Sequence, residues 1–333
     1  MGGQIGPELS VVLSTLGNHQ LLGRVLDGYE VQDADPGSFE VLVVADRAEP
    51  DPAAVRAAVG ERPYPVRMLT GSVPGLSANR NTGWRTAGAP VVLFTDNDTI
   101  PDQHLVSEHL AWHRQHPAVE VAVVGLVRWA RGIKVTPFMR WLERGVQFDY
   151  HSIPGTAASW AHLYGANSSI KVAMLERVNG YDEARFPYGY EDLDWGYRAR
   201  DHGLRVLLNR RAVVAHWREM TVADWQARAP RLAVSEWRFC RLHPDVPPWF
   251  HRLFSEAAAL PDGGRRSAAL ARLVPPRTPW LGPFVWARAG LHWRQQIAPY
   301  FLDAWDAAAA GRAPELQPAV SAFAERGASS GGS

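Results

Sequence analysis

Apolar residues recur in short runs through the first half of the chain, and segments with helical spacing separate these runs. The runs are Leu9–Thr15, Phe39–Asp46, Pro65–Gly71 and Pro90–Asp96, each typical of a strand buried on both faces. Residues 75–88 are expected to form a loop that leads into a helix. Strands that alternate with helices predict an α/β fold with a mostly parallel sheet and helices on both faces.

Polar side chains stand where several of these strands end. Thr15, Asp46 and the triplet Asp96-Asn97-Asp98 occupy such positions. Ligands of open α/β sheets bind beyond the carboxyl ends of the strands, so residues far apart in the sequence are expected to form one site.

The carboxylates of Asp96 and Asp98 are two residues apart, so on an extended chain they point to the same side. Carboxylates at the end of a buried strand require a cationic partner. A Mg²⁺-type site fits this pattern, because it uses one or two carboxylates and completes its shell with water and phosphate. A calcium loop does not fit, since Ile100 and Pro101 stand where an oxygen ligand and a glycine are required. A plain acidic turn is the alternative.

The second half of the chain has a less regular alternation of strand and helix patterns. Residues 121–130 predict another strand, and the aromatic stretch 136–164 is long enough to be a functional loop or lid. A helix is expected to start at Glu191-Asp192, and a strand is expected to end at His216. Because adjacent helical residues point about 100° apart, Glu191 and Asp192 are not expected to face one atom.

These patterns predict three parts of the chain. A catalytic α/β domain spans 1–223, with halves of about 1–120 and 121–223; a helical, Trp-rich extension spans 224–312; and 313–333 is a flexible tail. The extension is expected to pack as helices against the catalytic domain on the acceptor side. Peripheral membrane attachment is the alternative that its aromatic and basic residues leave open.

The composition narrows the class of protein. The 333 residues carry a net charge of +1, which gives no global reason to expect nucleic acid as a partner. The single cysteine, Cys240, excludes an internal disulfide and a cysteine-based zinc site. No run of eighteen apolar residues and no cleavable leader is found, so no transmembrane segment and a cytoplasmic location are expected.

Three motifs in order resemble those of the family 2 glycosyltransferases, which have the GT-A fold of nucleotide-diphospho-sugar transferases. The motifs are the opening strand and helix from Leu9, the passage GLSANRNTGWRTAGAPVVLFTDND, and the segment from GANSS through GYEDLDW to VVAHW. The resemblance covers about Leu9 to Trp217. It implies a nucleotide-sugar donor (a UDP-, GDP- or dTDP-sugar) and a divalent metal, Mn²⁺ or Mg²⁺.

The resemblance also implies residue roles. Asp96 would lie near ribose and base and join the metal site, Asp98 and His216 would bind the metal, and Asp192 would be the general base, with Glu191 contacting the acceptor. Thr15 and Asp46 would grip the base, and Arg80 and Asn79 would approach the diphosphate. Where the family usually has V-D-D-G-S, this chain reads VADRAEP, which leaves the identity of the nucleotide open.

The predicted reaction is a metal-dependent, inverting, non-processive transfer of a sugar to an acceptor hydroxyl. The acceptor is a small molecule, a glycan, or a lipid-linked or peptide acceptor. A retaining enzyme on the same fold is one alternative. The others are a sugar-1-phosphate nucleotidylyltransferase, although STLGNHQ lacks the basic Gly-rich loop it would need, and a non-catalytic carbohydrate-binding or scaffold relative.

Overall fold

The computed structural model describes residues 6–261 and 263–312, so the predicted tail 313–333 lies outside the described residues. The described chain divides into two compact units. Unit 1 comprises residues 6–132 and 152–218, and unit 2 comprises residues 133–151 and 219–312. Within these residues, no helix is long and apolar enough to cross a bilayer.

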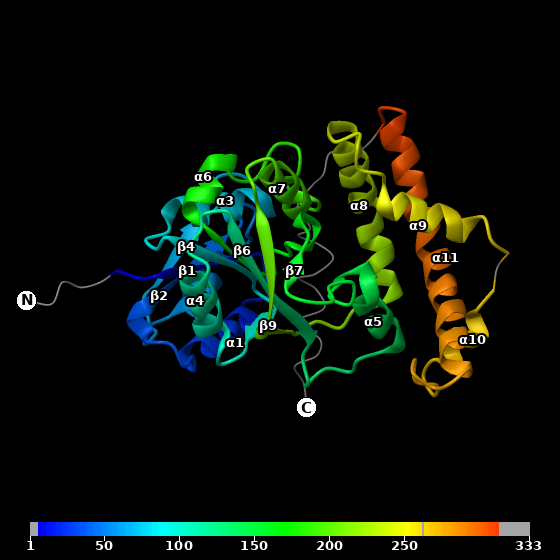
Figure 1. Cartoon of the computed structure of the whole chain (residues 1–333), viewed down its shortest axis with the longest axis horizontal. Helices are drawn as coiled ribbons and strands as arrows, with labels where there is room; N and C mark the ends of the chain where they lie inside the picture. The colour runs from blue at the N-terminus through cyan, green and yellow to red at the C-terminus, as the bar shows by residue number, and fades with distance from the viewer. Residues whose placement is uncertain (1–5, 262, 313–333) are drawn as a thin grey trace, which may run out of the picture. The chain divides into compact units, whose positions relative to one another are not determined.

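Unit 1 is built on one sheet, and its nine described strands follow the order β3-β2-β1-β4-β8-β6-β9-β5, with β7 paired to β9 (Figure 1). The strands are β1 (Leu9–Thr15), β2 (Phe39–Ala45), β3 (Val66–Thr70), β4 (Val91–Asp96), β5 (Thr99–Pro101), β6 (Val121–Trp129), β7 (Ala157–Ala158), β8 (Asn167–Lys171) and β9 (Arg205–His216).

The predicted α/β fold class is confirmed, and the sheet is mixed. β3, β2, β1 and β4 run parallel, as expected for strands joined by helices. β8 is antiparallel to both β4 and β6, while β6 and β9 are parallel. One expectation was wrong: β3 is not buried on both faces, because it is the edge strand and leaves Arg67 and Thr70 exposed.

Helices connect the strands of unit 1. They are α1 (His19–Glu30), α2 (Pro52–Val59), α3 (Leu76–Thr86), α4 (Leu105–Gln115), α6 (Val172–Val178) and α7 (Glu191–Arg200). α3 packs closely on β1, where Gly83 leaves no room for a side chain beside Val12. This close approach fixes the side chains of α3 next to the carboxyl ends of β1 and β4.

A buried polar network joins α4 to β8. His109 lies between Ser169 Oγ (2.7 Å from Nδ1) and Asn167 Oδ1 (2.9 Å from Nε2), and His113 Nε2 lies 2.8 Å from Ser169 Oγ. Asn167 Nδ2 also donates to the carbonyl oxygens of Leu126 and Ala212, at 3.2 and 3.1 Å. Because buried polar groups are costly unless they are satisfied, this network fixes the start of β8.

Unit 2 is helical and consists of α5 (Pro137–Trp141) with the turn Leu142–Val146, α8 (Val222–Leu242), α9 (Trp249–Ala258), α10 (Arg265–Leu270) and α11 (Leu281–Ala309). α11 packs along α8 and α9, and Figure 1 shows α8 and α11 in yellow-green and orange. Buried aromatic side chains form the core, with Phe254 and Phe301 5.0 Å apart and Trp293 beside Phe138 and Trp141. The expected helices are present, and most of the tryptophans among them serve packing.

Candidate active site

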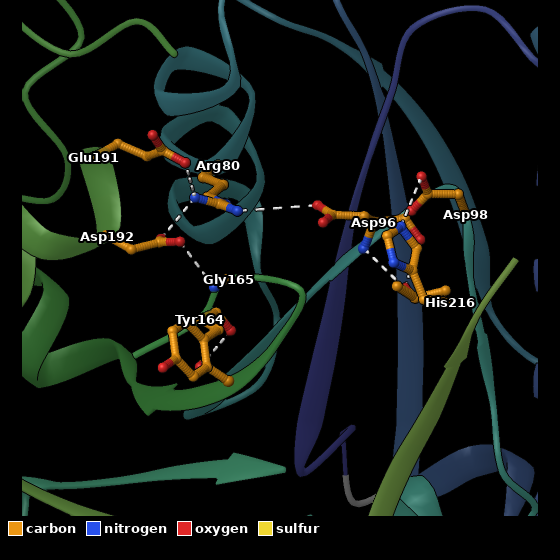
Figure 2. A network of polar contacts seen from close by, with 10 residues as sticks. Arg80, Asp96, Asp98, Tyr164, Gly165, Glu191, Asp192 and His216 are labelled. Carbon is orange, nitrogen blue, oxygen red and sulfur yellow. Dashed lines mark hydrogen bonds and ion pairs between the residues drawn. The ribbon is translucent and has the colours of Figure 1, made fainter. Parts of the chain in front are cut away.

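The Asp96-Asn97-Asp98 triplet forms the turn between β4 and β5. Asn97 Nδ2 donates hydrogen bonds to Thr15 Oγ1 (2.9 Å) and to the carbonyl oxygen of Gly17 (3.1 Å), which ties the turn to the end of β1. Thr99 Oγ1 donates to the carbonyl oxygen of Asp96 at 2.8 Å. Figure 2 shows Asp96 directed toward Arg80 and Asp98 toward His216, so the expectation that both carboxylates point to the same side was wrong, because the chain turns at Asn97 and Asp98 and is not extended there.

The Asp98 side chain meets His216, 118 residues later in the chain. The antiparallel pairing of β5 with β9 sets Thr99 opposite His216, and the Trp217 N–H donates to the carbonyl oxygen of Asp98 at 2.7 Å. His216 Nε2 therefore lies 3.3 Å from Asp98 Oδ2, and Trp129 stacks on the imidazole with ring centroids 5.3 Å apart. Among the described residues, the buried His216 Nδ1 has no hydrogen-bond partner.

The two aspartates of the triplet have opposite electrostatic surroundings. Burial opposes the charge of Asp98, but the His216 imidazole and the Arg218 guanidinium, 3.7 Å away, lower its pKa to about 2. Burial raises the pKa of Asp96 to about 6, since Arg80 only partly offsets the desolvation and Asp98 adds repulsion. A cation bound beside Asp96 and Asp98 would offset both the desolvation of these carboxylates and the repulsion between them.

Arg80, on α3, is the centre of a second cluster. Its side chain is 2% exposed, so it is not the surface arginine that a helix start could carry. Arg80 Nη1 donates to Glu191 Oε1 at 2.9 Å and to Asp192 Oδ1 at 2.6 Å. Arg80 Nη2 lies 3.9 Å from Asp96 Oδ1. Figure 2 shows the guanidinium between the Glu191-Asp192 pair and Asp96.

This geometry corrects the expectation that Glu191 and Asp192 do not face one atom. Both carboxylates contact the same nitrogen of Arg80. They do so because both side chains can rotate beyond Cβ, so the angle between the two Cβ directions does not decide where the oxygens lie. Although burial opposes the charge of Arg80, the two carboxylates raise its pKa, and it stays protonated.

Asp192 is held from two sides. Its Oδ2 accepts a hydrogen bond from the Gly165 N–H at 2.8 Å, opposite the bond to Arg80 (Figure 2). A side chain at Gly165 would occupy the place of the Arg80 guanidinium, which explains the glycine before β8. Burial raises the pKa of Asp192 to about 7; Arg80 and the Gly165 N–H oppose this shift, and the charge of Glu191 adds to it.

Thr15 ends β1, Asp46 directly follows β2 and Asn79 lies in α3, and each of them forms hydrogen bonds within the chain. The Asp46 carboxylate accepts from the Gly75 N–H (2.9 Å), Asn79 Nδ2 (3.0 Å) and the Ala48 N–H (2.8 Å). Asn79 is therefore directed at Asp46, and within the described chain its buried Oδ1 has no partner. Asp46 and Asn79 form a cluster separate from that of Arg80.

Two residues at the site, Trp129 and Arg218, were missed by sequence reasoning. Gly165 was included in the GANSS motif, but the hydrogen bond from its backbone N–H to Asp192 was not predicted, because no side-chain pattern reveals it. Trp129 ends β6 directly opposite His216 in the parallel pairing with β9. Arg218 could have been found, because it follows His216 by two residues and so extends to the same side as the imidazole.

The residues present fit a divalent cation of the Mg²⁺ or Mn²⁺ type. Asp98 and His216 offer a carboxylate and an imidazole 3.3 Å apart, and Asp96 lies on the other side of Asn97. Within residues 6–261 and 263–312, no three His, Cys, Asp or Glu side chains are grouped to hold a metal by themselves. The donor set suits a cation whose shell is completed by water and substrate phosphate.

A family model described as glycosyltransferase-like family 2 matches residues 7–233. The chain belongs to this family. A validoxylamine A glucosyltransferase of Streptomyces hygroscopicus subsp. limoneus is 26% identical over 277 residues, which cover 73% of this chain and 58% of that protein. A pre-mycofactocin glycosyltransferase of Mycobacterium tuberculosis (strain CDC 1551 / Oshkosh) is 26% identical over 172 residues, 51% of this chain and 36% of that protein. The chain thus spans less than two thirds of the length of these relatives.

Solved structures of two glycosyltransferases support the GT-A fold. The mannosyltransferase PcManGT of Pyrobaculum calidifontis, in complex with GDP-Man and Mn²⁺, has a TM-score of 0.54 at 20% identity and covers 93% of this chain and 77% of its own. Residues 1–349 of S. aureus TarS, in complex with UDP-GlcNAc, have a TM-score of 0.51 at 14% identity, with 92% of each chain covered. At these identities the likeness concerns the fold.

Proposed function

We propose that this protein of glycosyltransferase family 2 is a metal-dependent, inverting glycosyltransferase that adds one sugar from a nucleotide-sugar donor to an acceptor hydroxyl. The observation that carries the proposal is the position of Asp192 between Arg80 and the Gly165 N–H. The Asp192 carboxylate is thereby fixed beside the Arg80 guanidinium. This guanidinium also faces Asp96, the residue proposed to lie near the ribose.

Asp98 and His216 would hold the metal, with Asp96 beside it. The cation, when bound, would neutralise the charge that develops on the nucleoside diphosphate as it leaves. Arg80 contributes positive charge from the other side of Asp96, 3.9 Å from that carboxylate. The mannosyltransferase neighbour solved with Mn²⁺ supports a divalent metal for this chain.

Asp192 acts as the general base in this proposal. It takes the proton of the acceptor hydroxyl while the new bond forms between that oxygen and the anomeric carbon, and the bond to the diphosphate oxygen breaks. Attack opposite the leaving group inverts the anomeric configuration. A pKa of about 7 suits a base that must be deprotonated near neutral pH and still accept a proton.

Glu191 is proposed to contact the acceptor. Its Oε1 is engaged by Arg80, whereas its buried Oε2 has no hydrogen-bond partner among the described residues. A buried acceptor atom without a donor is costly, and a substrate hydroxyl would satisfy it. Two relatives are named as glycosyltransferases of validoxylamine A and pre-mycofactocin, and we propose an acceptor of a comparable kind for this chain.

The test is the product formed from donor. The protein is incubated with UDP-, GDP- and dTDP-sugars and Mn²⁺, and the released nucleotide is identified. A transferase releases the nucleoside diphosphate from one donor. Formation of a nucleoside triphosphate when pyrophosphate is supplied would identify a nucleotidylyltransferase, and binding of a nucleoside diphosphate without turnover of any donor would identify a non-catalytic relative.

A further inference from the structure

Residues 263–302 of unit 2 form a strongly basic stretch. They contain six arginines and no aspartate or glutamate, in a chain whose net charge is only +1. Four of the arginines lie in or next to α10 and before α11, and none of them forms an ion pair with a carboxylate of the described residues; they are Arg265, Arg266, Arg272 and Arg277. The charge of this stretch is therefore available to an external anion.

The same stretch exposes large apolar side chains. Trp280 is 96% exposed, Leu273 81% and Phe284 60%, and Leu270 and Leu281 are about half exposed. Trp286 and Trp293, on the same helix α11, are buried. Exposed and buried aromatics thus occur within a few residues of each other, and the exposed ones are not needed for the core of unit 2.

Three exposed side chains at the start of α11 share one face. Leu281, Phe284 and Arg288 fall within about 60° around the helix axis, whereas Trp286 and Ala289 project to the buried side. The Arg288 guanidinium lies 5.8 Å from the centre of the Phe284 ring. This face of α11 therefore combines apolar and cationic groups.

The turn that carries Trp280 is well anchored. Trp286 Nε1 donates to the carbonyl oxygen of Val274 at 2.8 Å, and Gly282 packs against the carbonyl oxygens of Pro275 and Pro276. Trp280 itself has φ 62° and ψ −49°, a conformation that is strained for a bulky residue. The fold thus holds a tryptophan in solvent at a conformational cost, which points to an external contact.

We propose that this part of unit 2 binds the surface of an anionic lipid bilayer. It is named here the α10–α11 surface, and it is made by Leu270, Arg272, Leu273, Arg277, Trp280, Leu281, Phe284 and Arg288. Arginines attract anionic headgroups, and tryptophan, phenylalanine and leucine enter the boundary between headgroups and acyl chains. A nucleic acid would use the arginines but would give no role to the exposed leucines Leu270, Leu273 and Leu281. The surface lies on the membrane without crossing it, in keeping with the absence of a spanning helix from the described residues.

The experiment measures binding of the full chain to vesicles by co-sedimentation. Phosphatidylcholine vesicles are compared with vesicles that also contain phosphatidylglycerol. We expect binding to the anionic vesicles that weakens as salt is raised above about 0.1 M, where charges are screened beyond about 10 Å. The double variant Trp280→Ala/Phe284→Ala should lower the partition coefficient at least about tenfold. Its control is Val31→Ala/Leu242→Ala, which changes exposed apolar residues elsewhere and should leave the partition unchanged.

A second pair of variants tests the charge. Arg272→Gln/Arg277→Gln should lower the partition into anionic vesicles about tenfold or more, since each arginine near such a surface contributes roughly a fivefold factor. Arg56→Gln/Arg131→Gln removes the same charge from exposed positions of unit 1 and should have little effect. Circular dichroism and thermal unfolding confirm that each variant is folded.

Three outcomes would overturn the proposal. The first is no binding of the wild-type chain to anionic vesicles. The second is equal loss in the variants of the α10–α11 surface and in their controls. The third is binding to heparin that is as tight as binding to vesicles and is unchanged by Trp280→Ala, because the surface would then recognise an acidic macromolecule.

Discussion

The two clusters of acidic residues in unit 1 are neutralised in different ways. Glu191 and Asp192 share a cation that the chain itself provides, the buried guanidinium of Arg80. Within the described residues, Asp98 has the His216 imidazole at 3.3 Å and the Arg218 guanidinium at 3.7 Å. The first cluster is complete within the protein, whereas the second has the composition of a site that an external cation completes. This difference separates the proposed roles of proton acceptor and metal ligand.

The largest expected effect concerns Asp192. Asp192→Asn keeps the size of the side chain but removes its ability to take a proton, so turnover should fall about 10²–10⁴-fold while affinity for the nucleoside diphosphate is kept. Nucleoside diphosphate release gives the rate, and calorimetry gives the affinity. Asp201→Asn, after the last turn of the same helix, is the control and should be near normal. If Asp192→Asn had near-normal turnover and Glu191→Gln lost turnover, Glu191 would be the general base and Asp192 the acceptor contact.

Replacement of the buried Arg80 should have an effect almost as large, but on the stability of the fold and not on turnover. Arg80→Leu leaves the buried Glu191 and the partly buried Asp192 without a cation and should lower the free energy of unfolding by about 3–5 kcal/mol, measured in urea at pH 8. Adding Glu191→Leu and Asp192→Asn to this variant should restore most of the loss. If Arg80→Leu were as stable as the wild type, the guanidinium would not be what holds this cluster together.

Variants of Asp98 and His216 should change the affinity for the nucleoside diphosphate in a way that depends on metal. Asp98→Ala and His216→Ala should weaken binding of the nucleoside diphosphate at least about tenfold with Mn²⁺ present, since even outer-shell partners of metal ligands cost 10–100-fold. Without metal the same variants should bind nearly as the wild type does. Asp102→Ala and His104→Ala, just beyond β5, are the matched controls. A loss of equal size without metal would show that these residues contact the nucleotide directly.

The smallest expected effect is the dependence on pH. Because burial raises the pKa of Asp192 to about 7, the base form is populated above that pH, and kcat/KM should fall up to tenfold for each pH unit below it. Of the groups around Asp192, Arg80 stays charged and burial raises the pKa of Tyr181 well above 10, whereas Asp96, whose pKa burial raises to about 6, titrates about one unit below Asp192. A flat profile between pH 5.5 and 8, values chosen to lie on both sides of about 7, would remove Asp192 from the role of base.

Stability must be followed over the same pH range, because the histidines under β8 also titrate. Burial lowers the pKa of His109 to about 4 and that of His113 to about 3. Both values lie below that of an unfolded histidine, so the unfolded state binds protons first as the pH falls below about 6.5. The free energy of unfolding should therefore decrease toward pH 4, and circular dichroism separates this loss from the loss of activity.

The order of strands and helices in the first half of unit 1 could be predicted from the sequence. The apolar runs at Leu9–Thr15 and Phe39–Asp46 became β1 and β2, and the helix start at Glu191 was found because Gly and Tyr give way to acidic residues there. Local patterns sufficed because a buried strand and an amphipathic helix each require their own spacing of apolar residues. The edge position of β3 was missed, since strand order depends on partners that are distant in sequence.

The candidate site, like the fold, has features that the sequence predicts and features that it does not. The sequence by itself determined which side chains are candidates for the chemistry, because carboxylates at strand ends, a histidine after an apolar run and an acidic helix start are local features. Only the tertiary structure decided which of them meet. Arg80 reaches Glu191 and Asp192 across 111 and 112 residues, and it does so because β8 pairs antiparallel with β4 and Gly165 leaves room for the guanidinium. Electrostatic partnership depends on distances of a few ångströms, and these are set by sheet register and close packing, which no local pattern specifies.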